Sequence, residues 1–145
     1  HDFSLADLTG NQVDLVTYKG KVLLVVNVAS QCGYTPQYQN LVALHERFES
    51  RGLLVLGFPA NNFGQQEPGT DAQIAEFCST RFAVSFPMFS KVSVKGADQH
   101  PLFQYLTSAA NPDFTGDIEW NFEKALGLVR GVGRRDGWPR RQFAS

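Results

Sequence analysis

Two apolar runs without polar alternation dominate the first sixty residues. Residues 21–29 read KVLLVVNVA and residues 52–60 read GLLVLGFPA. Such continuous runs are typical of strands that are buried on both faces of a sheet. The segment 36–48 lies between them, and its apolar residues recur at helical spacing: Tyr38, Leu41, Leu44 and Phe48. The pattern predicts a strand, a helix and a second strand.

Helix-start signals accompany this segment and a later one. Thr35 is placed to cap the first helix, and Pro36 suits its first position. Thr70 and Gln73 have the spacing of a capping box for a second helix. One face of that helix carries Ile74, Phe77, Cys78 and Phe82. The sequence therefore predicts two successive strand and helix units.

The remaining segments complete the predicted fold. Residues 1–21 alternate around two turns and predict a β-hairpin, and residues 86–94 predict an extended segment. Residues 100–109 predict a short helix, and residues 117–126 predict the entry to a further strand. The Asp-Gly pair in residues 134–138 suits a hairpin turn. Alternating strands and helices with a late strand pair indicate an α/β fold with a central mixed sheet, in one domain over residues 1–145.

Composition excludes several function classes. Lys and Arg number 13 against 14 Asp and Glu, and the net charge of −1 gives no reason to expect a nucleic acid or an anionic membrane as partner. The apolar runs are far shorter than the ~20 residues of a membrane span, and the N-terminus shows no secretory signal. We expect a soluble, cytoplasmic protein without membrane insertion that acts on a small molecule.

Cysteine usage points to chemistry rather than to structure. Two cysteines in 145 residues do not form a disulfide scaffold, and no cysteine and histidine spacing suggests a zinc site. We therefore expect no metal and no cofactor. Cys32 lies a few residues ahead of the first predicted helix, where free N–H groups favour an anion such as a thiolate.

The helix start alone is too weak to ionise a thiol. Converting most of an ordinary thiol to thiolate at neutral pH takes roughly 3.4 kcal/mol, whereas a helix N-terminus supplies ~2 kcal/mol at most. A hydrogen bond to a charged group contributes about 1.5–3 kcal/mol. One or two further donors must therefore point at the sulfur of Cys32.

Three motifs identify the family that this chain resembles. Residues 27–38 (NVASQCGYTPQY), 56–69 (LGFPANNFGQQEPG) and 120–124 (WNFEK) together resemble the glutathione peroxidase family in its cysteine form. The resemblance covers roughly residues 2 to 125. It implies a thioredoxin fold and a peroxidase whose Cys32 attacks the peroxide.

The resemblance also implies which residues surround the sulfur. Carried over by position, they are Asn62, Trp120 and Asn121, of which Asn62 stands where the family commonly has Gln. The Asn side chain is shorter but keeps an amide donor, and the Trp indole N–H is a donor only. Gln66 and Glu67 also match the family, and we interpret them as residues that shape the loop.

Cys78 occupies the place of the resolving cysteine in the thioredoxin-dependent branch of the family. The resemblance implies that the sulfenic acid of Cys32 condenses with Cys78 and that a thioredoxin-like protein reduces the disulfide, with glutathione as the other possible reductant. Because Cys78 is on the apolar face of its helix, this step requires local unwinding. The short segment before residue 116 lacks the long loop of the tetrameric, glutathione-using members, which indicates a monomer.

Other interpretations stay open beside this one. Cys78 fits a small core residue, Trp120 fits core packing, and Asn62 and Asn121 fit turn formers. The alternative function is a peroxide sensor that passes oxidation to a partner protein. A general thiol–disulfide oxidoreductase is disfavoured because Thr35 stands where a CxxC motif has its second cysteine.

Overall fold

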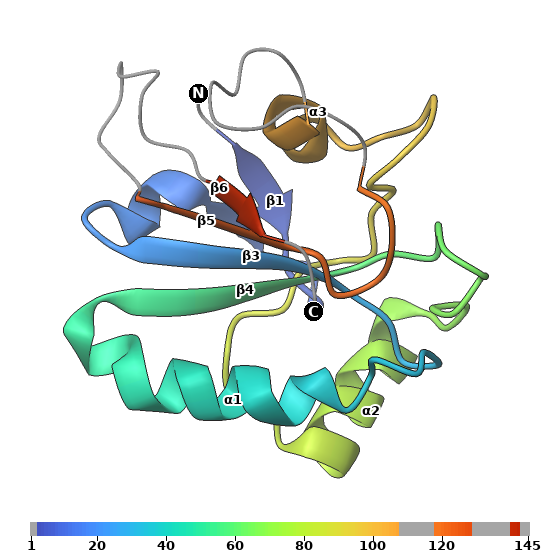
Figure 1. Cartoon of the computed structure of the whole chain (residues 1–145), viewed down its shortest axis with the longest axis horizontal. Coiled ribbons are helices and arrows are strands. Elements are labelled where there is room, and N and C mark those ends of the chain that lie inside the picture. The colour runs from blue at the N-terminus through green and yellow to red at the C-terminus, as the bar shows by residue number, and fades with distance from the viewer. Residues whose placement is uncertain (1–2, 108–117, 129–139, 143–145) are drawn as a thin grey trace.

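A four-stranded mixed sheet forms the centre of the structure. The computed structural model describes residues 3–107, 118–128 and 140–142. The strands lie in the order β4 (Leu53–Pro59), β3 (Val22–Val28), β5 (Lys124–Leu128) and β6 (Arg140–Gln142). β3 pairs with β4 in parallel and with β5 antiparallel, and β6 is antiparallel to β5. The predicted buried strands and the mixed sheet are confirmed (Figure 1).

Two further elements flank this sheet. β1 (Ser4–Ala6) and β2 (Gln12–Asp14) pair antiparallel, which confirms the predicted N-terminal hairpin. The segment 86–94 is extended, as predicted, but it meets β4 through a single bridge between Met88 and Gly57 rather than as a strand. The Asp-Gly turn predicted in residues 134–138 lies outside the described residues.

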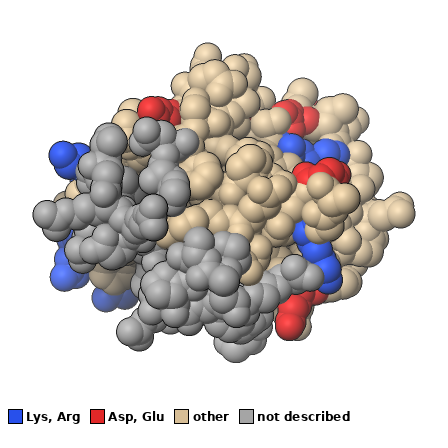
Figure 2. Space-filling model, turned by 90° about the horizontal axis from the view of Figure 1, so that it is seen from above, with Lys and Arg blue, Asp and Glu red and all other residues tan. Residues whose placement is uncertain are grey.

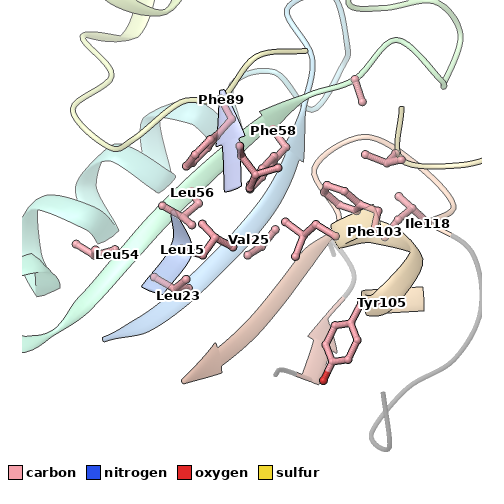
Figure 3. Packing of buried hydrophobic residues seen from close by; sticks show 14 of the residues in the cluster. Leu15, Leu23, Val25, Leu54, Leu56, Phe58, Phe89, Phe103, Tyr105 and Ile118 are labelled. Carbon is pink, nitrogen blue, oxygen red and sulfur yellow. The ribbon is translucent and has the colours of Figure 1, made fainter. Parts of the chain in front are cut away.

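Helices cover the sheet on both sides. α1 (Gln37–Phe48) and α2 (Asp71–Phe82) lie together on one face, whereas α3 (Pro101–Thr107) and β1 lie on the other (Figure 1). On the α3 side, Phe58 and Phe89 stack with their ring centroids 4.7 Å apart, and Phe103 meets Phe58 edge to face (Figure 3). The core on the other side contains Tyr38, Ile74 and Cys78. Each face of the sheet therefore has its own hydrophobic cluster.

Of the two helix starts predicted from the sequence, one is confirmed and the other is wrong. The capping box of α2 is confirmed: Gln73 N–H donates to the Thr70 hydroxyl, and Thr70 N–H donates to the Gln73 side chain. The predicted cap of α1 is wrong, because Pro36 occupies the N-cap position and makes no side-chain cap bond. The Thr35 hydroxyl instead accepts a hydrogen bond from Cys32 N–H and donates one to the carbonyl of Ala29.

The strand pairing brings three loops to one edge of the sheet. Val28 is level with Pro59 in the parallel pair, so the loops after β3 and β4 leave from the same end. Val26 is level with Lys124 in the antiparallel pair, so the residues before β5 also lie beyond that end. The carboxyl ends of parallel strands are where α/β folds place their sites. The candidate site is therefore expected at this edge.

The capping box of α2 can be tested by substitution. We expect Thr70→Ala to lower the free energy of unfolding by about 1 kcal/mol, because the Gln73 N–H at the helix start loses the Thr70 hydroxyl that accepts its hydrogen bond. Thr70→Ser retains the hydroxyl acceptor and serves as the control. Denaturant unfolding measures both variants, and equal loss in the two would contradict a role for the cap.

Candidate functional site

Cys32 lies in a turn between β3 and α1. Its backbone N–H donates to the Thr35 hydroxyl at 2.8 Å, and Thr35 N–H donates back to its carbonyl at 3.0 Å. The N–H of Tyr34 donates to the Cys32 sulfur at 3.3 Å. Cys32 is a free, partly exposed cysteine. The turn thus holds the sulfur at the surface and points one backbone donor at it. This donor belongs to the turn itself, since α1 begins only at Gln37.

The turn 120–123 is fixed to β3 by one residue. Asn27 Nδ2 donates to the carbonyl of Trp120 at 2.8 Å, and its backbone carbonyl accepts from Phe122 N–H at 2.6 Å. Asn27 is fully buried, and Phe122 has a left-handed backbone with φ 61°. The WNF segment is therefore held beside the carboxyl end of β3, the end from which the Cys32 turn leaves.

Gln66, in the loop after β4, joins all three loops. Its side-chain carbonyl accepts from Asn121 Nδ2 at 2.8 Å, and its backbone carbonyl accepts from Gln31 N–H at 2.9 Å. Gln31 is adjacent to Cys32 in the chain. The backbone of Gln66 does shape the loop, as we predict from sequence, but its amide also belongs to the candidate site. The match of residues 64–69 (GQQEPG) to the family was the feature of the sequence that could have predicted this role.

Asn62 makes its hydrogen bonds away from Cys32. Val94 N–H donates to its Oδ1 at 2.8 Å, and its Nδ2 donates to the hydroxyl of Ser93 at 3.0 Å and to the carbonyl of Lys95 at 3.2 Å. These bonds tie the loop after β4 to the segment that follows residue 92. Its role at the sulfur stays a prediction, and the amide that the structure connects to Asn121 is that of Gln66.

Trp120 is a large aromatic residue left on the surface. Its side chain is 41% exposed, and its ring centroid lies 5.7 Å from that of Phe63. Tyr34, two residues after Cys32, is the other exposed aromatic side chain in the described part of the chain and is 45% exposed. Trp120 therefore contributes little to the core, which argues against a purely structural role. Asn121, in contrast, is buried.

Cys78 lies inside the molecule on α2. The side chain is 3% exposed and packs in the cluster that Cys32 borders. Burial raises the pKa of the Cys78 thiol to about 11, which the hydroxyl of Tyr38 opposes and the carboxyl of Glu67 reinforces. Cys78 is thus a protonated thiol at neutral pH.

Charged side chains of both signs lie on the surface. On the face shown in Figure 2, basic and acidic side chains of the described residues alternate at the right, whereas basic side chains predominate at the left edge. The described residues hold no group of three or more His, Cys, Asp or Glu side chains placed to bind a metal ion. No helix among these residues is long and apolar enough to cross a membrane.

His45 is structural, as its place within α1 predicts. It is 2% exposed, and its Nδ1 accepts a hydrogen bond from Val55 N–H in β4 at 3.2 Å. Its Nε2 lies 3.5 Å from a carboxylate oxygen of Glu49. Because one ring nitrogen bonds to the backbone of β4 and the other faces Glu49, His45 is not a base for the candidate site.

A partly exposed cysteine that follows the carboxyl end of β3, in a mixed sheet with helices on both faces, is an arrangement of the thioredoxin fold. A thioredoxin-family thiol:disulfide interchange protein from Chlorobium tepidum has this fold, with a TM-score of 0.63 at 20% identity over 93% of this chain and 85% of that one. The likeness at this identity concerns the fold alone.

Closer matches define the family. The glutathione peroxidase family model matches residues 1–107. A hydroperoxy fatty acid reductase of Synechocystis is 55% identical over 132 residues, which cover 87% of this chain and 78% of that protein. The crystal structure of Trgpx in its apo form superposes with a TM-score of 0.70 at 37% identity, over 99% of this chain and 84% of that one. The chain belongs to the glutathione peroxidase family, and it is an oxidoreductase that reduces peroxides.

The clamp made by Asn27 can be tested with a matched pair of substitutions. Asn27→Asp removes the Nδ2 donor and leaves the carbonyl of Trp120 without its partner, which costs about 1–3 kcal/mol. We expect a loss of about that size in unfolding free energy and a fall in peroxide consumption of roughly fivefold or more.

Asn61→Asp is the control. The Oδ1 of Asn61 accepts a hydrogen bond from Glu67 N–H at 2.8 Å, and Asp retains an oxygen there. We expect this variant to keep its turnover. Equal turnover in the two variants would show that Asn27 does not position the WNF turn.

Proposed function

We propose that the Cys32 thiolate attacks the terminal oxygen of a hydroperoxide. The S–O bond forms as the O–O bond breaks, the sulfur is oxidised to a sulfenic acid, and water or an alcohol leaves after taking up a proton. The contact that carries this proposal is the N–H of Tyr34, 3.3 Å from the sulfur. It is the kind of donor that stabilises a thiolate.

Donors from the other loops complete the proposed site. The Trp120 indole and the Asn121 and Gln66 amides stabilise the charge that develops on the departing oxygen. Their support is the register of β3 with β5 and the hydrogen bond between Asn121 and Gln66. Organic hydroperoxides and hydrogen peroxide are the proposed substrates, since the Synechocystis relative is a hydroperoxy fatty acid reductase.

We infer that the sulfenic acid then condenses with Cys78. The S–S bond forms, the S–O bond breaks, and hydroxide leaves as water. A thioredoxin-like dithiol returns both cysteines to thiols, and glutathione is the alternative reductant. Support comes from the position of both cysteines at one hydrophobic cluster. We propose that the protein works as a cytoplasmic monomer.

One observation favours the sensor function as a second candidate. Cys78 is buried in a capped helix and its thiol has a pKa of about 11. A slow second step would leave the sulfenic acid of Cys32 available to a thiol of a partner protein. The two functions differ in the rate at which the internal disulfide forms.

Two cysteine variants test the main proposal. We expect Cys32→Ser to lose peroxide turnover by at least three orders of magnitude, because no other described cysteine is exposed. Cys78→Ser should still consume one equivalent of peroxide but then stop under thioredoxin. Mass spectrometry of the treated protein should show loss of two hydrogens in the unsubstituted chain and gain of oxygen in Cys78→Ser. Retained turnover in Cys32→Ser would refute the mechanism.

The donor role of Trp120 is tested separately. Trp120→Phe keeps an aromatic ring beside Phe63 but removes the indole N–H. We expect the rate of Cys32 oxidation to fall about tenfold or more, since a hydrogen bond to a charged group contributes about 1.5–3 kcal/mol. Tyr18→Phe, which removes a half-buried hydroxyl near the hairpin, controls for loss of an aromatic donor. An unchanged oxidation rate in Trp120→Phe would assign the residue to packing.

A further inference from the structure

Lys124, the first residue of β5, has a half-buried side chain. It is level with Val26 of β3, and residues that face each other in an antiparallel pair point to the same side of the sheet. Val26 packs in the cluster that also contains Tyr38 of α1. The lysine side chain therefore extends toward α1, and burial lowers the pKa of its ammonium.

The ammonium of Lys124 makes two hydrogen bonds to uncharged oxygens. It donates to Oε1 of Gln37, the first residue of α1, at 2.7 Å and to the carbonyl of Phe122 at 2.9 Å. No carboxylate of the described residues forms an ion pair with it. An apolar side chain would fill this place without taking a charge partly out of water, which costs free energy. Packing alone therefore does not explain the lysine, whereas the two segments that it joins do.

The bond to Gln37 leads to the turn that carries Cys32. The backbone N–H of Gln37 donates to the carbonyl of Tyr34 at 2.8 Å, and the N–H of Tyr34 donates to the Cys32 sulfur at 3.3 Å. Gln37 is thus joined to this turn by its backbone and to Lys124 by its side chain. An unbroken series of hydrogen bonds connects the ammonium with the turn of the nucleophile.

The bond to Phe122 leads to the WNF turn, residues 120–122. Phe122 follows Trp120 and Asn121 and has a left-handed backbone with φ 61°, which a bulky residue rarely adopts. Its N–H donates to the carbonyl of Asn27 at 2.6 Å, and its carbonyl accepts from Lys124. Both backbone groups of Phe122 are therefore held, and this stabilises the turn in its unusual conformation.

We propose that Lys124 is a positioning residue that holds the two donors of the WNF turn against the turn of Cys32 while a peroxide is attacked. This inference rests on the proposed function, in which those donors stabilise the departing oxygen. Lys124 acts through its bonds to Gln37 and Phe122 and takes no part in the chemical step itself. A displacement of about 1 Å in a reacting geometry can cost about a hundredfold in rate, so a residue of this kind has a measurable effect.

Two reactions of Cys32 separate this role from a general structural one. Alkylation by iodoacetamide needs only the thiolate, whereas oxidation by hydrogen peroxide also needs donors for the departing oxygen. The ratio of the oxidation rate constant to the alkylation rate constant, both taken at one pH, therefore reports the donors, because the thiolate fraction cancels. Cys78 is buried and protonated and adds little to either rate.

Lys124→Met removes the ammonium and keeps a flexible apolar chain. We expect the ratio of oxidation to alkylation to fall at least tenfold, because the WNF turn loses its bond to the start of α1. Lys21→Met is the control, since Lys21 is exposed and precedes β3 at the opposite end of the sheet. An unchanged ratio in Lys124→Met, or an equal fall in the control, would overturn the proposal.

A pair of substitutions at Gln37 tests the same contact from α1. Gln37→Met removes the acceptor of Lys124, whereas Gln37→Glu retains an oxygen there. We expect the ratio to fall about fivefold or more in Gln37→Met and to recover in Gln37→Glu. Combining Gln37→Met with Lys124→Met should lower the ratio no further than Lys124→Met alone, because both changes break one contact. Equal ratios in the two Gln37 variants, or losses that multiply in the double variant, would contradict the proposal.

Two further variants distinguish failure of this inference from failure of the proposed function. If Cys32→Ser keeps its peroxide turnover, the proposed function fails and the role of Lys124 fails with it. If Trp120→Phe lowers the ratio of oxidation to alkylation and Lys124→Met does not, the donors of the WNF turn keep their proposed role and only the role of Lys124 is refuted. A fall of the ratio in both Trp120→Phe and Lys124→Met supports the proposal.

Discussion

The pairing of β3 on both of its edges is the constraint on which the site depends. The parallel partner β4 and the antiparallel partner β5 bring the Cys32 turn, the loop after Pro59 and the turn before Lys124 to one end of the sheet. Asn27 fixes the last of these by bonding to Trp120 and Phe122 from within the strand. A shift of one residue in either register would move these side chains to the opposite face and separate the donors from the sulfur.

Local patterns in the sequence were sufficient to predict most of the fold. The unbroken apolar runs, the capping box at Thr70 and the alternating hairpin each depend on neighbouring residues, and the structure confirms them. The prediction that Thr35 caps α1 is wrong because its hydroxyl bonds to Cys32 instead. This interaction stabilises the turn rather than the helix start. The amide of Gln66 could not be assigned because its partner Asn121 is 55 residues away, and only the sheet brings the two together.

The two cysteines occupy opposite environments, and this difference orders the proposed chemistry. Cys32 is partly exposed in a turn with an N–H aimed at its sulfur, whereas Cys78 is buried among aromatic rings and stays protonated. In the proposed chemistry, a peroxide that enters the site therefore meets Cys32 and not the buried Cys78. The second thiol remains protected from direct oxidation until the first has reacted, since oxidation requires thiolate character and access.

Burying Cys78 also ties the second step to the stability of α2. The helix begins with a capping box, and its Asp71 binds Ser90 and the N–H of Lys91, so its first turn is anchored at both sides. Its last turn ends at Ala83, which has a left-handed backbone with φ 47°, a conformation that a non-glycine residue rarely adopts. In the proposed disulfide step, Cys78 is therefore released by unwinding from this end rather than from the anchored start.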